Sequence, residues 1–302
     1  MVCILRIVSL FSGSKILVVA GTMNYKLTHS TYIMEVSFDD QTVKNVKYKI
    51  LPNYPIAFRR AAFGSFYERS WIMGGEESNG KCYEFDQEEY HPIPSLNVNR
   101  SNAASAFIRN KVIIAGGVND TVYLDSIEIL RINESNHGSQ WYQAFSKLPI
   151  QVHSHTMVTC NDRLYLIGGD YDGLGESDKI WEGTLISDPF EVKWKELGFR
   201  LQKKRVGHFS FVISNTIIIF GGRNILDDFV EIIEDNKLRQ GARVPFELNT
   251  FNDPAVLDRK NRVIITSKKY GLIVYDHQNE TIQDYPNVKL RKERNRYATI
   301  IQ

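Results

Sequence analysis

The stretch TIIIFGG, residues 216–222, sets four consecutive Ile or Phe side chains in front of two glycines. An apolar run that ends in Gly-Gly also occurs at SWIMGG (70–75), VIIAGG (112–117) and LYLIGG (164–169). Such an unbroken run is typical of an inner strand that is buried on both faces. Glycine permits positive φ and close backbone approach, so each pair predicts a place where chain segments crowd together.

The second glycines recur at intervals of roughly fifty residues, which is the signature of a repeat architecture. Gly21, at the end of KILVVAG, continues the series toward the N-terminus. RVIITS (262–267) continues it toward the C-terminus, with Thr266 and Ser267 in place of the glycines. The chain of 302 residues therefore holds six units, and the predicted structural glycines are Gly21, Gly74, Gly75, Gly116, Gly117, Gly168, Gly169, Gly221 and Gly222.

Each unit reads as four short strands separated by turn signals. A short apolar run and a polar turn precede the Gly-Gly strand, as in HFSFVI-SN-TIIIFGG, and two further strands follow it. Helical periodicity is missing from the sequence. Four antiparallel strands repeated six times predict an all-β, six-bladed β-propeller. We expect one domain over 1–302, with approximate blades at 1–57, 58–98, 99–150, 151–202, 203–247 and 248–302.

The units resemble kelch repeats, and the resemblance covers essentially the whole chain. Arg205-Val-Gly-His208 reproduces the Arg-x-x-His that often opens a repeat of that family. The motif decays to Arg59-Arg-Ala-Ala62, Arg100-Ser-Asn-Ala103 and Val152-His-Ser-His155 in other units. The family's Tyr and Trp pair of the outer strands is also poorly kept, so the chain looks like a divergent member.

Two segments compete for the inner strand of the first blade, which closes the ring. One is 4–11, and the other is 297–302, headed by Arg294 and Arg296. Kelch rings usually complete a blade with a terminal strand from the other end of the chain, which favours 297–302. The segment 1–14 would then be displaced, for instance as a leader peptide.

Basic side chains head the inner strands in this repeat register. The candidate partner-binding residues are Arg60, Arg100, His155, Arg205, His208 and Arg296. If they converge, they form a basic ring that grips an acidic peptide through charge-assisted arginine contacts. In the kelch family, arginines at such positions line peptide-binding pockets. The alternative is that the arginines bond backbone carbonyls between blades and hold the ring together.

The bulk composition excludes several classes of function. A net charge of +2 gives no reason to expect a nucleic-acid partner, and no apolar stretch is long enough to span a bilayer. The three cysteines are scattered, so we expect free thiols and a cytoplasmic protein, with secretion as the alternative. His153, His155 and His208 lack acidic or thiol partners at matching register, so we expect neither a metal nor a cofactor.

Catalytic motifs are also missing, since no nucleophile and base stand at a telling spacing. The leading hypothesis is a non-catalytic protein-interaction module that serves as a substrate-recognition, scaffold or cytoskeletal adaptor. The family resemblance alone raises a link to ubiquitin ligases, whose kelch receptors carry a BTB domain that this sequence lacks, or to actin. The alternative class is a kelch-type propeller enzyme that acts on a small molecule such as a sugar.

Overall fold

The computed structural model describes most of the chain. The described residues are 3–11, 15–23, 26–27, 31–39, 42–56, 58–66, 69–86, 88–132, 140–187, 191–223, 225–248, 255–258, 260–267 and 269–288. Every regular element in these ranges is a β-strand. None of the described residues belongs to a helix that could cross a membrane.

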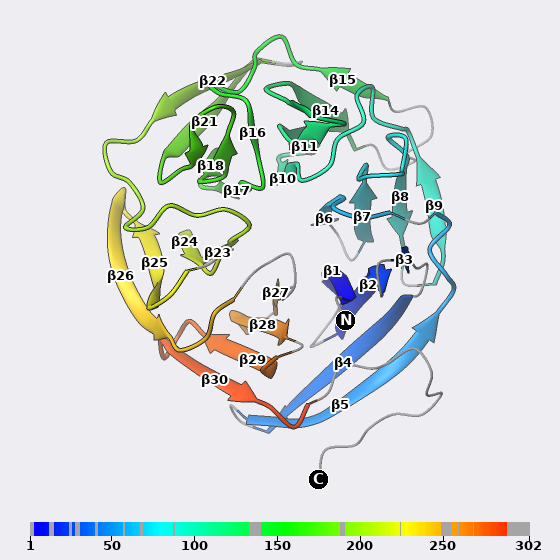
Figure 1. Ribbon diagram of the computed structural model, residues 1–302, viewed down its shortest axis with the longest axis vertical. Coiled ribbons are helices and arrows are strands. Elements are labelled where there is room, and N and C mark those ends of the chain that lie inside the picture. Colours follow the sequence, from blue (N-terminus) through cyan, green and yellow to red (C-terminus); the bar gives the residue numbers. More distant parts are fainter. Residues whose placement is uncertain are drawn as a thin grey trace.

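Six antiparallel sheets are arranged in a ring (Figure 1). Residues of β6 (Ala62–Phe66), β10 (Ala104–Ile108), β17 (Thr156–Cys160) and β23 (Phe209–Ile213) line a cavity at its centre, which we term the channel. Each sheet is one blade, and its first strand lies nearest the channel. The prediction of an all-β propeller built from four-stranded antiparallel blades is confirmed.

The strands of the first three blades are as follows. Blade 1 contains β1 (Cys3–Phe11), β2 (Lys15–Met23), β4 (Thr31–Asp39) and β5 (Thr42–Leu51), with the short β3 (Lys26–Leu27) beside β2. Blade 2 contains β6 (Ala62–Phe66), β7 (Arg69–Met73), β8 (Cys82–Phe85) and β9 (Tyr90–Ile93). Blade 3 contains β10 (Ala104–Ile108), β11 (Lys111–Ala115), β14 (Ile127–Arg131) and β15 (Trp141–Gln143).

The remaining blades follow the same order. Blade 4 contains β17 (Thr156–Cys160), β18 (Arg163–Ile167), β21 (Ile180–Ser187) and β22 (Glu191–Glu196). Blade 5 contains β23 (Phe209–Ile213), β24 (Thr216–Phe220), β25 (Asp228–Glu234) and β26 (Lys237–Val244). Blade 6 contains β27 (Ala255–Leu257), β28 (Arg262–Ser267), β29 (Gly271–Asp276) and β30 (Thr281–Tyr285).

The N-terminal segment closes the ring, which corrects the expectation that residues 297–302 do so. β1 pairs with β2 and lies between β6 of blade 2 and β27 of blade 6 (Figure 1). The inner position of blade 1 is therefore occupied by 3–11, whereas 297–302 lie outside the described residues. Gly21 sits in β2 where the register with β1 shifts between Ile4 and Leu5, as a bulge residue does.

The apolar Gly-Gly strands are the second strand of their blades, not the innermost one as the sequence suggests. β24 lies between β23 and β25, and all five of its residues are buried. β11 is likewise buried along its whole length. Continuous apolarity arises because each face of these blades packs against a neighbouring blade.

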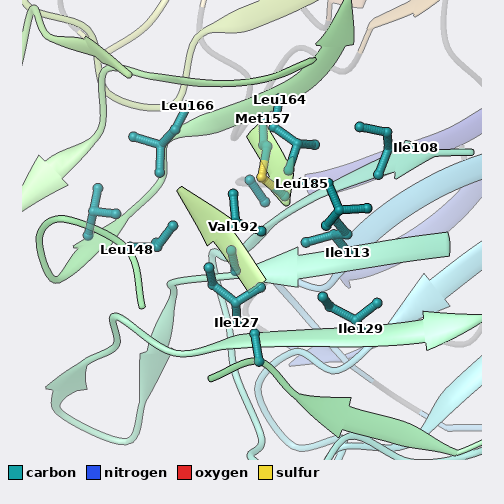
Figure 2. Packing of buried hydrophobic residues seen from close by; sticks show 14 of the residues in the cluster. Ile108, Ile113, Ile127, Ile129, Leu148, Met157, Leu164, Leu166, Leu185 and Val192 are labelled. Atoms are coloured by element: carbon teal, nitrogen blue, oxygen red, sulfur yellow. The ribbon is translucent and has the colours of Figure 1, made fainter. Parts of the chain in front are cut away.

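Hydrophobic clusters fill the six spaces between adjacent blades. One cluster joins blades 3 and 4 and includes Ile113, Ile129, Leu164 and Leu166 (Figure 2). Another joins blades 6 and 1, where Ile264 and Leu272 pack with Met34 and Val36. Because the last blade packs on the first as the others pack on one another, the ring is closed by the same apolar burial throughout.

The paired glycines adopt positive φ in all four clear repeats. Gly117 has φ +95, and a Cβ on it would lie 2.6 Å from the carbonyl oxygen of Ser101. Gly116 has φ +62, and a Cβ there would lie 2.6 Å from the carbonyl oxygen of Val152, which belongs to the next blade. Each glycine pair thus marks the close approach of two blades.

The glycine pairs turn the chain onto one end of the ring, which we term the loop face. Small additional strands lie there: β12 (Val118–Asn119) pairs with β13 (Val122–Tyr123). β19 (Asp170–Tyr171) pairs with both β16 (Val152–His153) and β20 (Gly175–Glu176). These hairpins connect the second and third strands of blades 3 and 4 and carry the side chains of the candidate site.

Candidate binding recess on the loop face

Two of the predicted partner-binding arginines, Arg100 and Arg205, are fully buried. Arg100 donates to the carbonyl oxygens of Gly116 and Ser126, both at 3.0 Å, and to a carboxylate oxygen of Glu128 at 2.7 Å. Arg205 donates to the carbonyl oxygen of Gly221 at 2.7 Å and binds Asp228 and Glu231. Neither guanidinium is available to a partner, so the expected basic ring does not include them.

Each buried arginine also connects two blades through its own main chain. The carbonyl oxygen of Arg100 accepts the N–H of Gly75, and that of Arg205 accepts the N–H of Gly169, both at 2.8 Å. A structural role for these arginines was the alternative to partner binding, and the contacts favour it. Burial lowers the pKa of Arg205, but the carboxylates of Asp228 and Glu231 outweigh it and leave that pKa raised.

The predicted histidines His155 and His208 are buried between blades. The ring of His155 lies over Gly116, whose Cβ would come within 2.7 Å of Cε1, and His208 covers Gly168 in the same way at 3.0 Å. Burial lowers the pKa of His155 to about 3 and that of His208 well below its usual value. Both rings are therefore neutral packing groups near pH 7, and neither faces the loop-face surface.

Arg60 occupies a different register from Arg100 and Arg205. Counted back from the second glycine, the residue of blade 2 that matches Arg100 is Phe58, which is buried. Arg60 instead matches Asn102, Ser154 and Gly207, and all four have φ between +52 and +59. The motif comparison equated Arg59 with Arg205. Counted from the second glycine, Phe58 and not Arg59 matches Arg205, so the motif was one residue out of register.

Main-chain hydrogen bonds link these four residues in series around the channel, and we term the four residues the belt. Asn102 donates its main-chain N–H to the carbonyl of Arg60, Ser154 to Asn102, and Gly207 to Ser154, each at 2.8 Å. The belt joins blades 2, 3, 4 and 5 at the loop face. Arg296, the last predicted site residue, lies outside the described residues.

A recess of about 520 Å³ opens beside the belt. Its walls come from three belt residues, Arg60, Asn102 and Ser154, and from side chains of neighbouring loops, including Glu76, Asp120, Thr121, Tyr123, His153 and Arg223. The volume falls in the range of sites that hold a small molecule or a few side chains of a partner. Of the five predicted residues that the structure describes, only Arg60 lines it.

The arginines of the recess are paired with carboxylates. Arg60 binds Glu76 at 2.5 Å, and Arg59 contacts the other oxygen of the same carboxylate. Arg223 binds Glu176 at 2.9 Å and lies 3.7 Å from Asp170. The recess therefore presents mixed charge, which corrects the prediction of a basic surface.

His153 and Tyr123 form the aromatic part of the recess. Their ring centroids are 4.5 Å apart at an interplanar angle of 66°, and His153 Nδ1 lies 2.8 Å from Ser154 Oγ. Burial lowers the pKa of His153, and Arg223 and Arg60 add to this against the opposing charge of Asp170. His153 is thus a neutral hydrogen-bonding ring near pH 7.

A second cavity, of about 370 Å³, lies in the channel between the first strands of blades 2 to 5. Phe107, Met157 and Phe211 contribute apolar surface, and Ser105 and Ser210 contribute hydroxyls. Ser105 donates to the carbonyl of Phe63 at 2.6 Å, and Ser210 bonds Thr156 at 2.5 Å. The hydroxyls are already engaged in linking neighbouring blades.

The sequence carried a usable signal for the missed residues. Arg223, Asp170, Val118 and Glu76 each follow the second glycine of a pair directly. The hairpins that begin there bring in Tyr123 and Asp120, so the loop after Gly-Gly is where site residues concentrate. In the described part of the chain, no three His, Cys, Asp or Glu side chains gather as a metal site would require.

A ring of four-stranded antiparallel blades defines a β-propeller. Residues 99–133 match the kelch motif. The chain is 25% identical to Kelch-like protein 40 of Xenopus tropicalis over 138 residues, which cover 38% of this chain and 22% of the relative. An F-box/kelch-repeat protein of Arabidopsis thaliana is 29% identical over 102 residues, 33% of this chain and 21% of that protein.

The fold comparison agrees with these relatives. The structure of YjhT superposes with a TM-score of 0.69 at 13% identity, over 94% of this chain and 98% of the other. The fold is therefore that of a β-propeller, and the kelch motif at 99–133 together with these relatives supports kelch repeats in this chain. The chain spans only about a fifth of the length of the curated relatives it matches.

Proposed function

We propose that this chain is a non-catalytic protein-interaction module that binds a partner on its loop face. The observation that carries the proposal is the recess of about 520 Å³, built on the belt and walled by exposed hairpins. Loops on a rigid scaffold are where proteins place binding residues. The similarity to kelch-like and F-box/kelch-repeat proteins supports a recognition or adaptor role in the cytoplasm, where the buried free thiols of Cys82 and Cys160 would persist.

The shape and chemistry of the recess suit a protruding side chain or loop of a partner. Tyr123 and His153 offer aromatic surface with polar edges, which is the residue chemistry of interaction hot spots. Arg60 and Arg223 are held by carboxylates and so are already oriented. A partner can insert without reorganising the ring, because the belt fixes the backbone below.

A propeller enzyme that acts on a small molecule is the second candidate. The recess volume and the paired Tyr123 and His153 favour it, since both are within the range of small-molecule sites. The two candidate functions predict different ligands in the recess, a segment of a partner protein in one case and a small molecule in the other. A panel of sugars and other metabolites that raises the melting temperature and is turned over would establish the enzyme.

The test of the interaction module uses steric blocking. A tagged full chain captures partners, and the dissociation constant of a purified partner is then measured for Thr121→Trp and Ile186→Trp. Thr121 is exposed at the recess, whereas Ile186 is exposed near the end of β21 that leads into β22. We expect Thr121→Trp to weaken binding at least about ten-fold, or 1.4 kcal/mol, and Ile186→Trp to have no effect. Equal affinities of both variants would show that the recess is not the site.

A further inference from the structure

Three successive hairpins on the loop face each expose one large apolar side chain. We term them tip 3 (118–123), tip 4 (170–176) and tip 5 (225–228). The exposed fraction is 59% for Val122 in tip 3, 71% for Leu174 in tip 4 and 71% for Leu226 in tip 5. Val122 and Leu174 stand five residues after the second glycine of their repeats and Leu226 stands four, so the exposure recurs in three neighbouring blades, whereas single exposed apolar residues need no explanation.

Each exposed apolar residue stands within two residues of an exposed aspartate. These aspartates are Asp120 in tip 3, Asp172 in tip 4 and Asp227 in tip 5. Asp120 and Asp172 have no ion-pair partner within the described ranges. Asp227 binds Arg243 at 2.9 Å, but both side chains are more than half exposed, so a partner's cation can compete for this carboxylate.

The three tips adjoin one another. Tyr123 of tip 3 packs against His153, whose strand β16 pairs with β19 of tip 4. Asp170 and Asp172 of tip 4 contribute, after burial, to raising the pKa of Tyr123, as nearby negative charges do. Arg223, just before tip 5, binds Glu176 of tip 4 at 2.9 Å. The tips therefore form one continuous rim beside the recess.

The rim keeps acidic charge beside the recess because the arginines there are engaged, while Lys203 donates to the carbonyl oxygens of Leu226 and Asp227 in tip 5. Arg60 is held by Glu76, and Arg223 by Glu176 and Asp170. Tip 4 also has space for a partner, since a Cβ on Gly173 or Gly175 would meet no other atom within 4 Å. Each tip thus presents an apolar side chain and an aspartate side by side along an accessible edge.

From this arrangement we infer that the partner is a protein segment in which Lys or Arg side chains alternate with apolar side chains. Its apolar side chains cover Val122, Leu174 and Leu226, and its cations pair with Asp120, Asp172 and Asp227. This chemistry is opposite to the acidic peptide expected from the sequence, because the arginines behind that expectation are buried or paired. The inference rests on the proposed function and specifies the partner of the same face.

The experiment pans a random peptide library displayed on phage against the full chain. Selected peptides are synthesised, and their dissociation constants are measured for the wild type, Asp120→Asn/Asp172→Asn, Leu174→Ser/Leu226→Ser, Thr121→Trp and the control Ile186→Ser. We expect peptides rich in Lys or Arg and Leu, Ile or Phe. Leu174→Ser/Leu226→Ser should weaken binding by at least roughly ten-fold, because the apolar side chains of the peptide then lose their apolar partners.

Charge should show itself in two further ways. Asp120→Asn/Asp172→Asn should weaken binding several-fold, and higher salt should reduce wild-type affinity more than that of this variant. Selected peptides that are acidic or uncharged, or that tolerate the Asp→Asn and Leu→Ser variants but lose binding in Thr121→Trp, overturn the partner chemistry and leave the proposed function standing. Peptides that bind all variants equally overturn both.

Discussion

The main-chain N–H of Gly169 donates to the carbonyl oxygen of Arg205 over 2.8 Å, although the two residues belong to blades 4 and 5. The guanidinium of Arg205 reaches in the other direction, to the carbonyl of Gly221 in its own blade at 2.7 Å. One arginine thus holds the glycine turns of two blades together. Gly75 and Arg100 repeat the first half of this relationship between blades 2 and 3.

Replacing Arg205 by Met should strongly destabilise the ring. The substitution leaves the carboxylates of Asp228 and Glu231 buried without their cation, which costs about 3–5 kcal/mol. Unfolding in urea measures the loss. The matched control is Arg243→Met, which removes an exposed pair with Asp227 and should cost about 1 kcal/mol or less. Similar small losses for both variants would argue against a structural role for Arg205 between the blades.

Gly117→Ala should cost about 2 kcal/mol or more in the free energy of unfolding. Gly117 has φ +95, and the new Cβ would lie 2.6 Å from the carbonyl oxygen of Ser101 and 2.9 Å from Cβ of Ala103. Gly198→Ala is the control, because its Cβ would meet nothing within 4 Å, and should change stability by about 0.5 kcal/mol or less. A neutral Gly117→Ala would contradict the crowding of blades at the glycine pairs.

Stability should fall as the pH is lowered from about 6.5 toward 3. Burial holds the pKa of His155 near 3 in the folded protein, whereas the unfolded chain binds a proton at an ordinary histidine pKa. Between these values the unfolded state carries more protons, so the free energy of unfolding rises with pH by up to about 1.4 kcal/mol per unit. The increase in the free energy of unfolding is complete once the pH exceeds the histidine pKa of the unfolded chain.

His155→Ala isolates that contribution, since alanine occupies the equivalent positions 61 and 103. Urea unfolding of both proteins at several pH values from 6.5 to 4.5 should give a shallower pH dependence for the variant. Parallel curves would mean that His155 is not the buried neutral base described above.

Deleting residues 1–11 should destabilise the ring more than deleting 297–302. β1 covers the inner edge of β2 and lies against β6 and β27, so its loss exposes an unpaired strand edge. Melting temperature and aggregation rate of the two truncated chains provide the comparison. If deleting 297–302 were the more destabilising change, the C-terminal segment and not β1 would close the ring.

Much of the fold could be predicted from the sequence because one local requirement recurs. Only glycine accepts the positive φ and close approach at positions such as Gly117, so the period of the pairs reveals the blades. Closure was harder to predict, because both termini carry an apolar segment that could fill one place. Pairing of β1 with β2 decides it, and that pairing leaves no local mark on the sequence.

The site was less predictable, because a basic residue looks the same in a motif whether it is buried or free. Arg205 is neutralised by Asp228 and Glu231, which lie more than twenty residues away in the sequence. Arg60 is displaced from its expected register, and only the φ of +59 and the bond from Asn102 reveal its place in the belt. These relationships appear only when the blades are side by side.

The central claim is that a partner binds the loop face through the recess and the three tips. Hydrogen–deuterium exchange of the full chain, with and without a bound partner or selected peptide, tests it directly. We expect slower exchange in residues 118–123, 170–176 and 225–228. Exchange should stay unchanged in the turns at Arg109–Asn110 and Asn161–Asp162, which follow the first strands of blades 3 and 4 at the end away from the glycine pairs. Protection of those turns, with the tips unaffected, would contradict it.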